Sequence, residues 1–259
     1  MNALHRCPDQ TDGPAWGAWI KLSSVESTEI MAQAGFDFCV VDLEHTLMDL
    51  SAVLTHLAVG QALGMRMLVR IPDLTPSLIQ RLLDAGADGI VAPHVDNAEI
   101  AARFVQYTRF PPRGARGSGG TSRAGGWGRT PRPDYLARTG LAIGQIESVA
   151  AVADVESIAR VDGLGALMLG PADLSLDAAG HADPAMFSST VRAAARAAGL
   201  LVGTAVGASA LPRVHDEQYD FIVCGNDVTT LATGASQLIE TVRDLMSRAA
   251  IIEHEEHLT

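Results

Sequence analysis

The sequence predicts a single (β/α)₈ barrel of the TIM type. Short apolar runs rich in Val, Ile and Leu alternate eight times with longer segments of helical period, and Gly, Pro or Asp marks each boundary. The 259 residues suit one such barrel. This alternation requires a parallel sheet. Eight units without residues for a second domain favour closure over the alternative, a doubly wound sheet.

The apolar runs place the expected strands in order along the chain. We expect them at 17–22, 36–43, 66–71, 89–93, 141–146, 166–169, 201–205 and 221–224, with helices in the gaps. Four of these helices end in a glycine that directly precedes the next strand, as AQAG, QALG, LDAG and RAAG, at Gly35, Gly64, Gly86 and Gly199. Glycine is the residue expected just past a helix end.

Composition narrows the classes of partner and compartment. The net charge of −11 excludes a basic footprint for nucleic acid or for a membrane surface, and Lys21 is the single lysine. The cysteines, Cys7, Cys39 and Cys224, form no CxxC pair, so neither a disulfide framework nor a thiolate zinc site is indicated. Residues 1–16 lack the apolar core of a signal peptide, and no apolar stretch reaches membrane-spanning length. We expect a cytoplasmic protein.

The domain prediction is one barrel over 1–259, with an N-terminal extension at 1–16 and a C-terminal tail at 246–259. The HEEH sequence in that tail is expected to be a solvated, frayed segment. The long interruption at 111–133 is rich in Gly and Ser, and arginines make it basic, among them Arg113, Arg116, Arg123 and Arg129. We interpret this segment as an active-site lid, with a solvated linker as the alternative.

Catalytic groups of such barrels come from the carboxyl ends of the strands. Glu147 in GQIES and Asp173 in LGPAD end neighbouring strands, which lie ~4.8 Å apart in a sheet. Two converging carboxylates suit a hard divalent cation such as Mg²⁺ or Mn²⁺. The alternative is that both acids only cap the helices that follow.

Arg70 lies in the apolar run MLVRIP, where a guanidinium is costly unless an anion meets it. We expect it to bind a carboxylate or enolate oxygen, and a salt bridge to Asp42 or Glu44 is the alternative or accompanying role. His45, in the cluster DLEH, is the group best placed to move a proton near neutral pH, although a lone histidine is usually structural. His94 is a second candidate.

Five motifs together, GFDFCVVDLEH, MLVRIPD, RFPPRGARG, GQIES and LGPADLS, resemble in order and spacing the HpcH/HpaI family of class II 2-oxo acid aldolases. The resemblance covers about residues 17–245. It implies a barrel of the phosphoenolpyruvate/pyruvate type, and a divalent metal (Mg²⁺ or Mn²⁺, with Co²⁺ as a further candidate) without an organic cofactor. The implied reaction reversibly cleaves or forms 4-hydroxy-2-oxo acids from pyruvate and an aldehyde through a metal-stabilised enolate.

The resemblance also implies roles for individual residues. Glu147 and Asp173 match the metal ligands, with Gln145 beside them, and Arg70 matches the residue that holds the oxo acid. His45 matches an acid–base histidine that acts through water and pairs with an aspartate of a neighbouring subunit, which Asp84 matches. The backbone around Gly170, Ala172 and Asp173 matches the site of the oxo-acid carboxylate. Apart from the resemblance, Asp42 and Glu44 are expected to support these residues without binding substrate themselves.

The family fold further implies a last helix exchanged between subunits and a hexamer built as a trimer of dimers. In the segment after RG this chain has GSGGTSRAGGWG, where bulkier residues are expected, so the aldehyde-side pocket is expected to be wider or more mobile. Arg123 is a candidate to bind a distal carboxylate of the aldehyde there.

Several other functions compete with this interpretation. A Schiff-base aldolase needs an amine, for which only Lys21 is available. A citrate-synthase-like transferase or an oxaloacetate decarboxylase is an alternative on the same fold. GTAVG and CGND follow the last two strands, where many barrels hold phosphate, so a phosphorylated substrate is a minor alternative. A non-catalytic barrel that binds a small acid is the alternative from another class.

Overall fold

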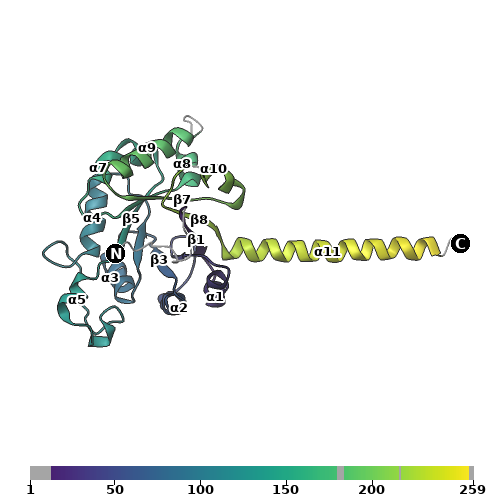
Figure 1. Cartoon of the computed structure of the whole chain (residues 1–259), viewed down its shortest axis with the longest axis horizontal. Helices are drawn as coiled ribbons and strands as arrows, with labels where there is room; N and C mark the ends of the chain where they lie inside the picture. The colour runs from purple at the N-terminus through teal and green to yellow at the C-terminus, as the bar shows by residue number, and fades with distance from the viewer. Residues whose placement is uncertain (1–12, 180–183, 216, 257–259) are drawn as a thin grey trace.

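The computed structural model describes residues 13–179, 184–215 and 217–256 and confirms the predicted barrel (Figure 1). Eight parallel strands close in chain order, from β1 to β8 and back to β1. Their bounds are β1 Ala15–Ile20, β2 Phe38–Asp42, β3 Arg66–Arg70, β4 Gly89–Ala92, β5 Leu141–Ile146, β6 Ala166–Leu169, β7 Leu201–Ala205 and β8 Phe221–Asn226.

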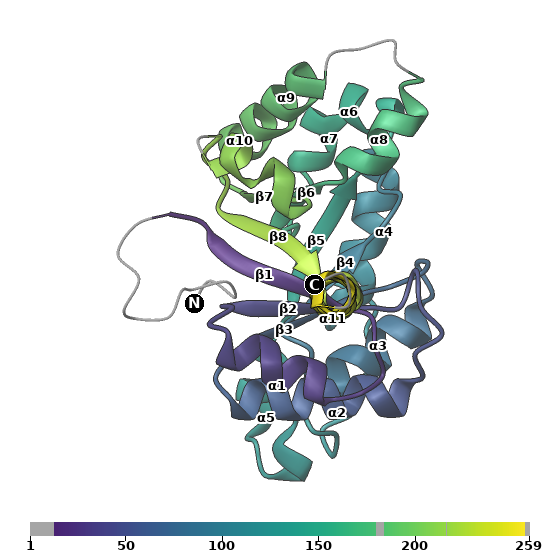
Figure 2. The same cartoon turned by 90° about the vertical axis from the view of Figure 1, so that its right-hand side faces the viewer.

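Helices follow the strands and surround the barrel, with α1 and α2 on one side of the strands and α9 and α10 on another in Figure 2. Their bounds are α1 Glu26–Gln33, α2 Leu50–Ala62, α3 Pro76–Asp84, α4 Ala98–Thr108, α5 Arg132–Ala137, α6 Val149–Ala153, α7 Val155–Ala159, α8 Pro171–Asp177, α9 Pro184–Ala197, α10 Leu211–His215 and α11 Asp227–Glu256, with short 3₁₀ turns η1 Gly126–Gly128 and η2 Ala208–Ala210.

The predicted strands coincide with the observed ones to within two residues at every end. All four predicted stop glycines adopt the left-handed region, with φ of 92°, 86°, 95° and 69° at Gly35, Gly64, Gly86 and Gly199. Glycine populates this region without the steric penalty that a Cβ imposes. Each glycine therefore allows the chain to leave a helix and enter the next strand directly.

Alternation along the strands divides the apolar residues into two cores. One set points into the barrel, including Phe38, Val40, Leu68 and Ile143, and the other set packs between strands and helices. Because side chains alternate with period two, the inward row of each strand continues past its apolar part. The next inward positions are polar: Lys21, Asp42, Arg70, Gln145 and Glu147. The fold thus gathers these side chains at the carboxyl end of the barrel.

The last helix, α11, extends away from the barrel (Figure 1). Every side chain from position 228 to 247 is exposed, including Leu231, Leu238, Val242 and Leu245. The backbone remains helical to Glu256, through most of the segment expected to be a tail. His254 and His257 of the HEEH sequence lie outside the part of the chain whose side chains are described, as do residues 1–12. None of the described helices is both long and apolar enough to cross a membrane.

Residues 111–133, predicted to be a lid, connect α4 to β5. In a barrel of this kind, helices run back toward the amino ends of the strands, so a helix-to-strand connection lies at the end opposite to the catalytic mouth. Contacts agree with this topology, because Arg116 pairs with Asp84 at the last turn of α3. The segment therefore does not cover the mouth of its own barrel, and the prediction of a lid over that mouth is wrong for the single chain.

Candidate active site at the carboxyl end of the barrel

A buried ion cluster connects the ends of β1, β2 and β3. Asp42 and Arg70 are partners in the β2–β3 register. The Nε and Nη2 atoms of Arg70 donate to the two carboxylate oxygens of Asp42 at 2.9 and 2.8 Å, in a bidentate pair. Lys21 Nζ donates to the same carboxylate at 2.6 Å. Asp42 is fully buried, and its charge is met by two cations.

The pKa of Asp42 reflects this balance. Burial alone would raise it, but hydrogen bonds and positive charge from Arg70 and Lys21 outweigh burial and lower the pKa from 3.8 to about 2. Arg70 also meets Glu44, with Nη1 2.8 Å from Oε2, and its guanidinium lies 4.2 Å from the ring centroid of Trp19. The salt bridges expected of Arg70 are therefore present, and the same side chain lines the cavity at the mouth.

A second cluster surrounds Glu147. Its Oε1 accepts from the backbone N–H of His94 at 2.7 Å and lies 3.0 Å from Nδ1 of the same histidine, while Gln145 Nε2 donates to Oε2. One ligand atom each from Glu44, His94 and Glu147 lie within 4.8 Å of one another. Burial raises the pKa of Glu147; the hydrogen bond from His94 opposes this shift, and the negative charges of Glu44 and Asp173 reinforce it.

This arrangement fits a divalent cation. A cation would relieve the repulsion among carboxylates that raises the pKa of Glu147. Gln145 Oε1 is buried without a hydrogen-bond partner in the described residues, so an oxygen donor is free beside Glu147. The backbone of Gly170 packs closely against both side chains: a Cβ at this position would lie 3.0 Å from Gln145 Nε2 and 3.2 Å from Glu147 Oε2. The close packing needs a residue without a side chain.

A cavity of about 410 Å³ opens beside both clusters. Arg70 and Gln145 line it, together with Gly170, Ala172 and Asp173, which follow β6. Asp173 is exposed and does not belong to the tight group around Glu147, although its charge reaches that carboxylate. The structure thus brings the two predicted metal ligands to one mouth and adds Glu44 and His94 near Glu147.

His45 lines the same cavity, and its side chain is 57 % exposed. Its Nε2 lies 3.8 Å from Glu44 Oε2, and its backbone N–H donates to Asp42 Oδ1 at 3.4 Å. The imidazole is therefore held by few contacts and is accessible to water and to a bound ligand. That environment suits a group that exchanges protons with solvent.

Two predicted site residues lie away from this mouth. Asp84 ends α3 at the opposite end of the barrel and accepts from Arg116 Nη2 at 2.6 Å. Arg123 Nη1 donates to Gln61 Oε1 at 2.6 Å, also at that end. Within one chain Asp84 does not meet His45, and Arg123 does not line the cavity at the mouth. The pairing of Asp84 with a neighbouring subunit's histidine and the binding of an aldehyde carboxylate by Arg123 both stay predictions.

One contact of the mouth could not be predicted from the sequence. His94 was a second candidate for proton transfer, but its place beside Glu147 depends on a backbone φ of 53° two residues after β4, which turns both its N–H and its imidazole toward Glu147. The segments GTAVG and CGND, noted in the sequence because they follow the last two strands, supply part of the cavity wall: Ala205, Val206, Gly207, Gly225 and Asn226.

Comparisons with known proteins agree with the geometry. The family described as HpcH/HpaI aldolase/citrate lyase matches residues 16–234. A hydroxypyruvate/pyruvate aldolase of Paraburkholderia phytofirmans is 34% identical over 257 residues, covering 93% of this chain and 98% of that protein. A 4-hydroxy-2-oxo-heptane-1,7-dioate aldolase of Salmonella typhimurium is 36% identical, covering 87% of this chain and 89% of that protein.

Solved structures show the same relationship. A HpcH/HpaI aldolase/citrate lyase family protein from Burkholderia cenocepacia superposes with a TM-score of 0.81 at 35% identity, covering 89% of this chain and 95% of that one. A citrate synthase superposes with a TM-score of 0.79 at 22% identity, covering 90% and 94%, and this likeness shows the fold alone. The sequence match over nearly the whole barrel identifies the chain as a member of the HpcH/HpaI aldolase/citrate lyase family.

Proposed function

We propose that the protein is a divalent-metal-dependent aldolase, which reversibly cleaves or forms 4-hydroxy-2-oxo acids from pyruvate and an aldehyde. The observation that carries the proposal is the carboxylate cluster around Glu147, which lies beside Arg70 at the mouth of the barrel. Similarity to proteins named as pyruvate and 4-hydroxy-2-oxo-acid aldolases supports the reaction class. We expect the protein to use Mg²⁺, Mn²⁺ or Co²⁺.

Glu147 and Asp173 would hold the cation, with Gln145 beside them. A bound divalent cation supplies positive charge that makes a nearby ketone more electron-withdrawing. Arg70 lines the cavity with a guanidinium already fixed by Asp42 and Glu44, so its charge is oriented before substrate arrives. In our proposal it binds the oxo acid and stabilises the oxygen that becomes negative when the carbon–carbon bond breaks.

His45 would move the proton of the substrate hydroxyl, through water. In the cleavage direction that proton leaves the hydroxyl as the aldehyde carbonyl forms and the electron pair of the broken bond passes to the pyruvate fragment. In the reverse direction His45 returns the proton to the new alkoxide. The backbone after β6, around Gly170, Ala172 and Asp173, lines the cavity at the place proposed for the carboxylate of the oxo acid.

The proposal includes a homo-oligomer. The outward helix α11, which exposes its apolar side chains, supports an exchange of this helix between copies of the chain. The position of Asp84 at the far end of its own barrel fits a role toward the His45 of a neighbouring copy. We infer a hexamer of the family type, a trimer of dimers.

The first experiment measures oxaloacetate decarboxylation and exchange of the C3 protons of pyruvate, before and after removal of metal by a chelator. In Glu147→Gln we expect both rates to fall at least about a hundredfold because a ligand charge is lost. Adding Mg²⁺, Mn²⁺ or Co²⁺ to the chelated wild type should restore them. The matched control is Glu156→Gln, which removes an exposed carboxylate from α7 and should change neither rate.

Rates that survive chelation and the Glu147→Gln change would overturn the metal-dependent mechanism. Metal-dependent binding of pyruvate without either reaction would favour a barrel that only binds a small acid.

A further inference from the structure

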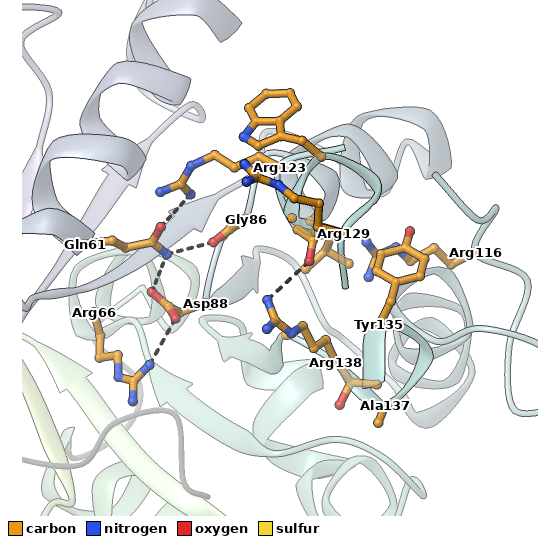
Figure 3. Close-up of a pocket in the computed structure, with 17 residues that line it drawn as sticks. Gln61, Arg66, Gly86, Asp88, Arg116, Arg123, Arg129, Tyr135, Ala137 and Arg138 are labelled. Carbon is orange, nitrogen blue, oxygen red and sulfur yellow. Dashed lines mark hydrogen bonds and ion pairs between the residues drawn. The ribbon is translucent and has the colours of Figure 1, made fainter. Parts of the chain in front are cut away.

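A second and larger cavity lies at the amino end of the barrel, opposite to the candidate active site. Its volume is about 1060 Å³, and its walls come from the ends of α2 and α3, the start of β3, the turn before β4, Arg116 and the region 123–140 (Figure 3). Five arginines line it: Arg66, Arg116, Arg123, Arg129 and Arg138. Among the described residues of its lining, Asp88 carries the one carboxylate.

Two of these arginines are paired with acids. Arg66 Nη1 lies 3.2 Å from Asp88 Oδ1, and Arg116 Nη2 lies 2.6 Å from Asp84 Oδ1. In both pairs the aspartate carboxylate offsets the positive charge of the arginine. The Arg116 side chain is only 2 % exposed, and its Nε has no hydrogen-bond partner in the described structure, although it lies in the cavity wall.

The other three arginines of the lining form no ion pair with an acid among the described residues. Arg123 donates to the neutral Gln61 side chain, and Arg138 Nη1 donates to the carbonyl of Ala124 at 3.2 Å. Arg129 has neither an ion pair nor a hydrogen bond from its side chain within the described ranges. Figure 3 shows these three side chains around the same space. Three arginines without an ion pair thus line one cavity, in a chain whose net charge is −11.

We propose that this cavity is a second binding site, for a small polyanion that carries two or more negative charges. Converging cations repel one another, and an anion bound between them removes that repulsion. Guanidinium groups recognise phosphate and carboxylate oxygens through paired N–H donors. The volume is that of a site for a small molecule. The site lies across its own barrel from Glu147, and Arg129 and Arg138 have no part in the proposed aldolase reaction.

The test is isothermal titration calorimetry on the full chain, freed of metal on a chelating resin, at constant ionic strength. Pyrophosphate and citrate are the two probes, and acetate is the monovalent control. The variant is Arg129→Gln with Arg138→Gln, since both side chains are exposed and their loss leaves the packing intact. The matched control removes two exposed arginines outside the cavity, Arg103→Gln with Arg160→Gln.

We expect saturable binding of a polyanion to the wild type, no saturable binding of acetate, and affinity at least about tenfold weaker in the cavity variant. The control variant should bind as the wild type does. Binding of pyrophosphate alone would assign phosphate groups, and binding of citrate alone would assign carboxylates; either supports the site.

Absence of binding by both probes would overturn the proposal, as would equal weakening in both variants or a loss that follows Arg70→Gln instead. Aldolase activity of the same preparations, measured after Mg²⁺ or Mn²⁺ has been added back, separates the two proposals. An inactive wild type that binds polyanions as expected contradicts only the proposed function.

Discussion

Asp42 determines how Arg70 is presented at the mouth of the barrel. Its carboxylate receives two N–H groups of Arg70 and the ammonium of Lys21, and it is fully buried. A buried charge is tolerated only when partners compensate it, and removal of one partner leaves the others uncompensated. The cluster therefore fixes the guanidinium and leaves its outer face toward the cavity.

Asp42→Asn should destabilise the fold by about 3–5 kcal/mol at pH 7, because two cations lose their buried counter-charge. The lowered pKa also predicts a pH dependence. The stabilisation linked to the shift from 3.8 to about 2 is roughly 2 kcal/mol; it is present above about pH 4 and is lost as the pH falls through about 2. The stability difference between wild type and variant should therefore narrow from pH 5 toward pH 2. Urea unfolding across this range measures it, and a constant difference would contradict the assignment.

Lys21 carries the single amine side chain in the sequence, so a Schiff-base mechanism would have to use it. Its Nζ lies 2.6 Å from Asp42 Oδ2, and this ion pair holds the amine against the carboxylate rather than against a substrate carbonyl. Borohydride reduction in the presence of pyruvate should leave the mass of the protein unchanged. Lys21→Arg, which keeps a cation beside Asp42, should retain activity within about tenfold. A mass increment located at Lys21 would overturn this expectation.

At the scale of elements, the strands and their ends were predictable from the sequence because they follow from period-two alternation. Asp42, Arg70, Gln145 and Glu147 continue the inward rows of apolar strands, so their convergence follows from barrel closure. His94 was harder to predict, since its contact with Glu147 depends on a left-handed turn at a non-glycine residue.

The segment 111–133 illustrates a different difficulty. Its length and Gly content suggested a lid, but its place between a helix and a strand puts it at the amino end of its own barrel. That topological signal was present in the sequence. The position of Arg123 beside Gln61 could not be predicted from local pattern, because the two residues are 62 positions apart.

Helix α11 exposes an apolar stripe at spacings of three and four residues: Val228, Leu231, Leu238, Val242 and Leu245. A continuous apolar surface of this kind on a helix marks a site of contact with another protein surface. The double change Leu238→Glu with Leu245→Glu should therefore shift the protein to smaller assemblies, as measured by sedimentation velocity. The matched control, Ser236→Glu with Ser247→Glu, adds the same charges to the other face of the helix and should leave the assembly unchanged. Equal behaviour of both variants would contradict a role for the stripe.

At the scale of the whole molecule, one chain does not bring all the predicted catalytic groups together. His45 lies at the carboxyl end of the barrel and Asp84 at the other end. Only a contact in which one end of a barrel meets the other end of a second barrel can unite them. Such a contact uses two different surfaces, and it must close on itself if it is not to form open filaments. A closed hexamer is consistent with this requirement.

Mixing two inactive variants tests this arrangement. His45→Asn and Asp84→Asn should each reduce aldolase activity strongly when expressed alone. If each site takes His45 from one chain and Asp84 from another, co-expression of the two variants with different affinity tags should restore up to about a quarter of the wild-type activity, because random assembly gives that share of sites with both residues intact.

A mixture of His45→Asn with Glu147→Gln is the control. Both residues belong to the mouth of the same chain, so every site in this mixture carries one of the two defects. Activity restored only in the first mixture supports a site shared between chains; restoration in neither mixture would place the function of Asp84 within its own chain, where it holds Arg116.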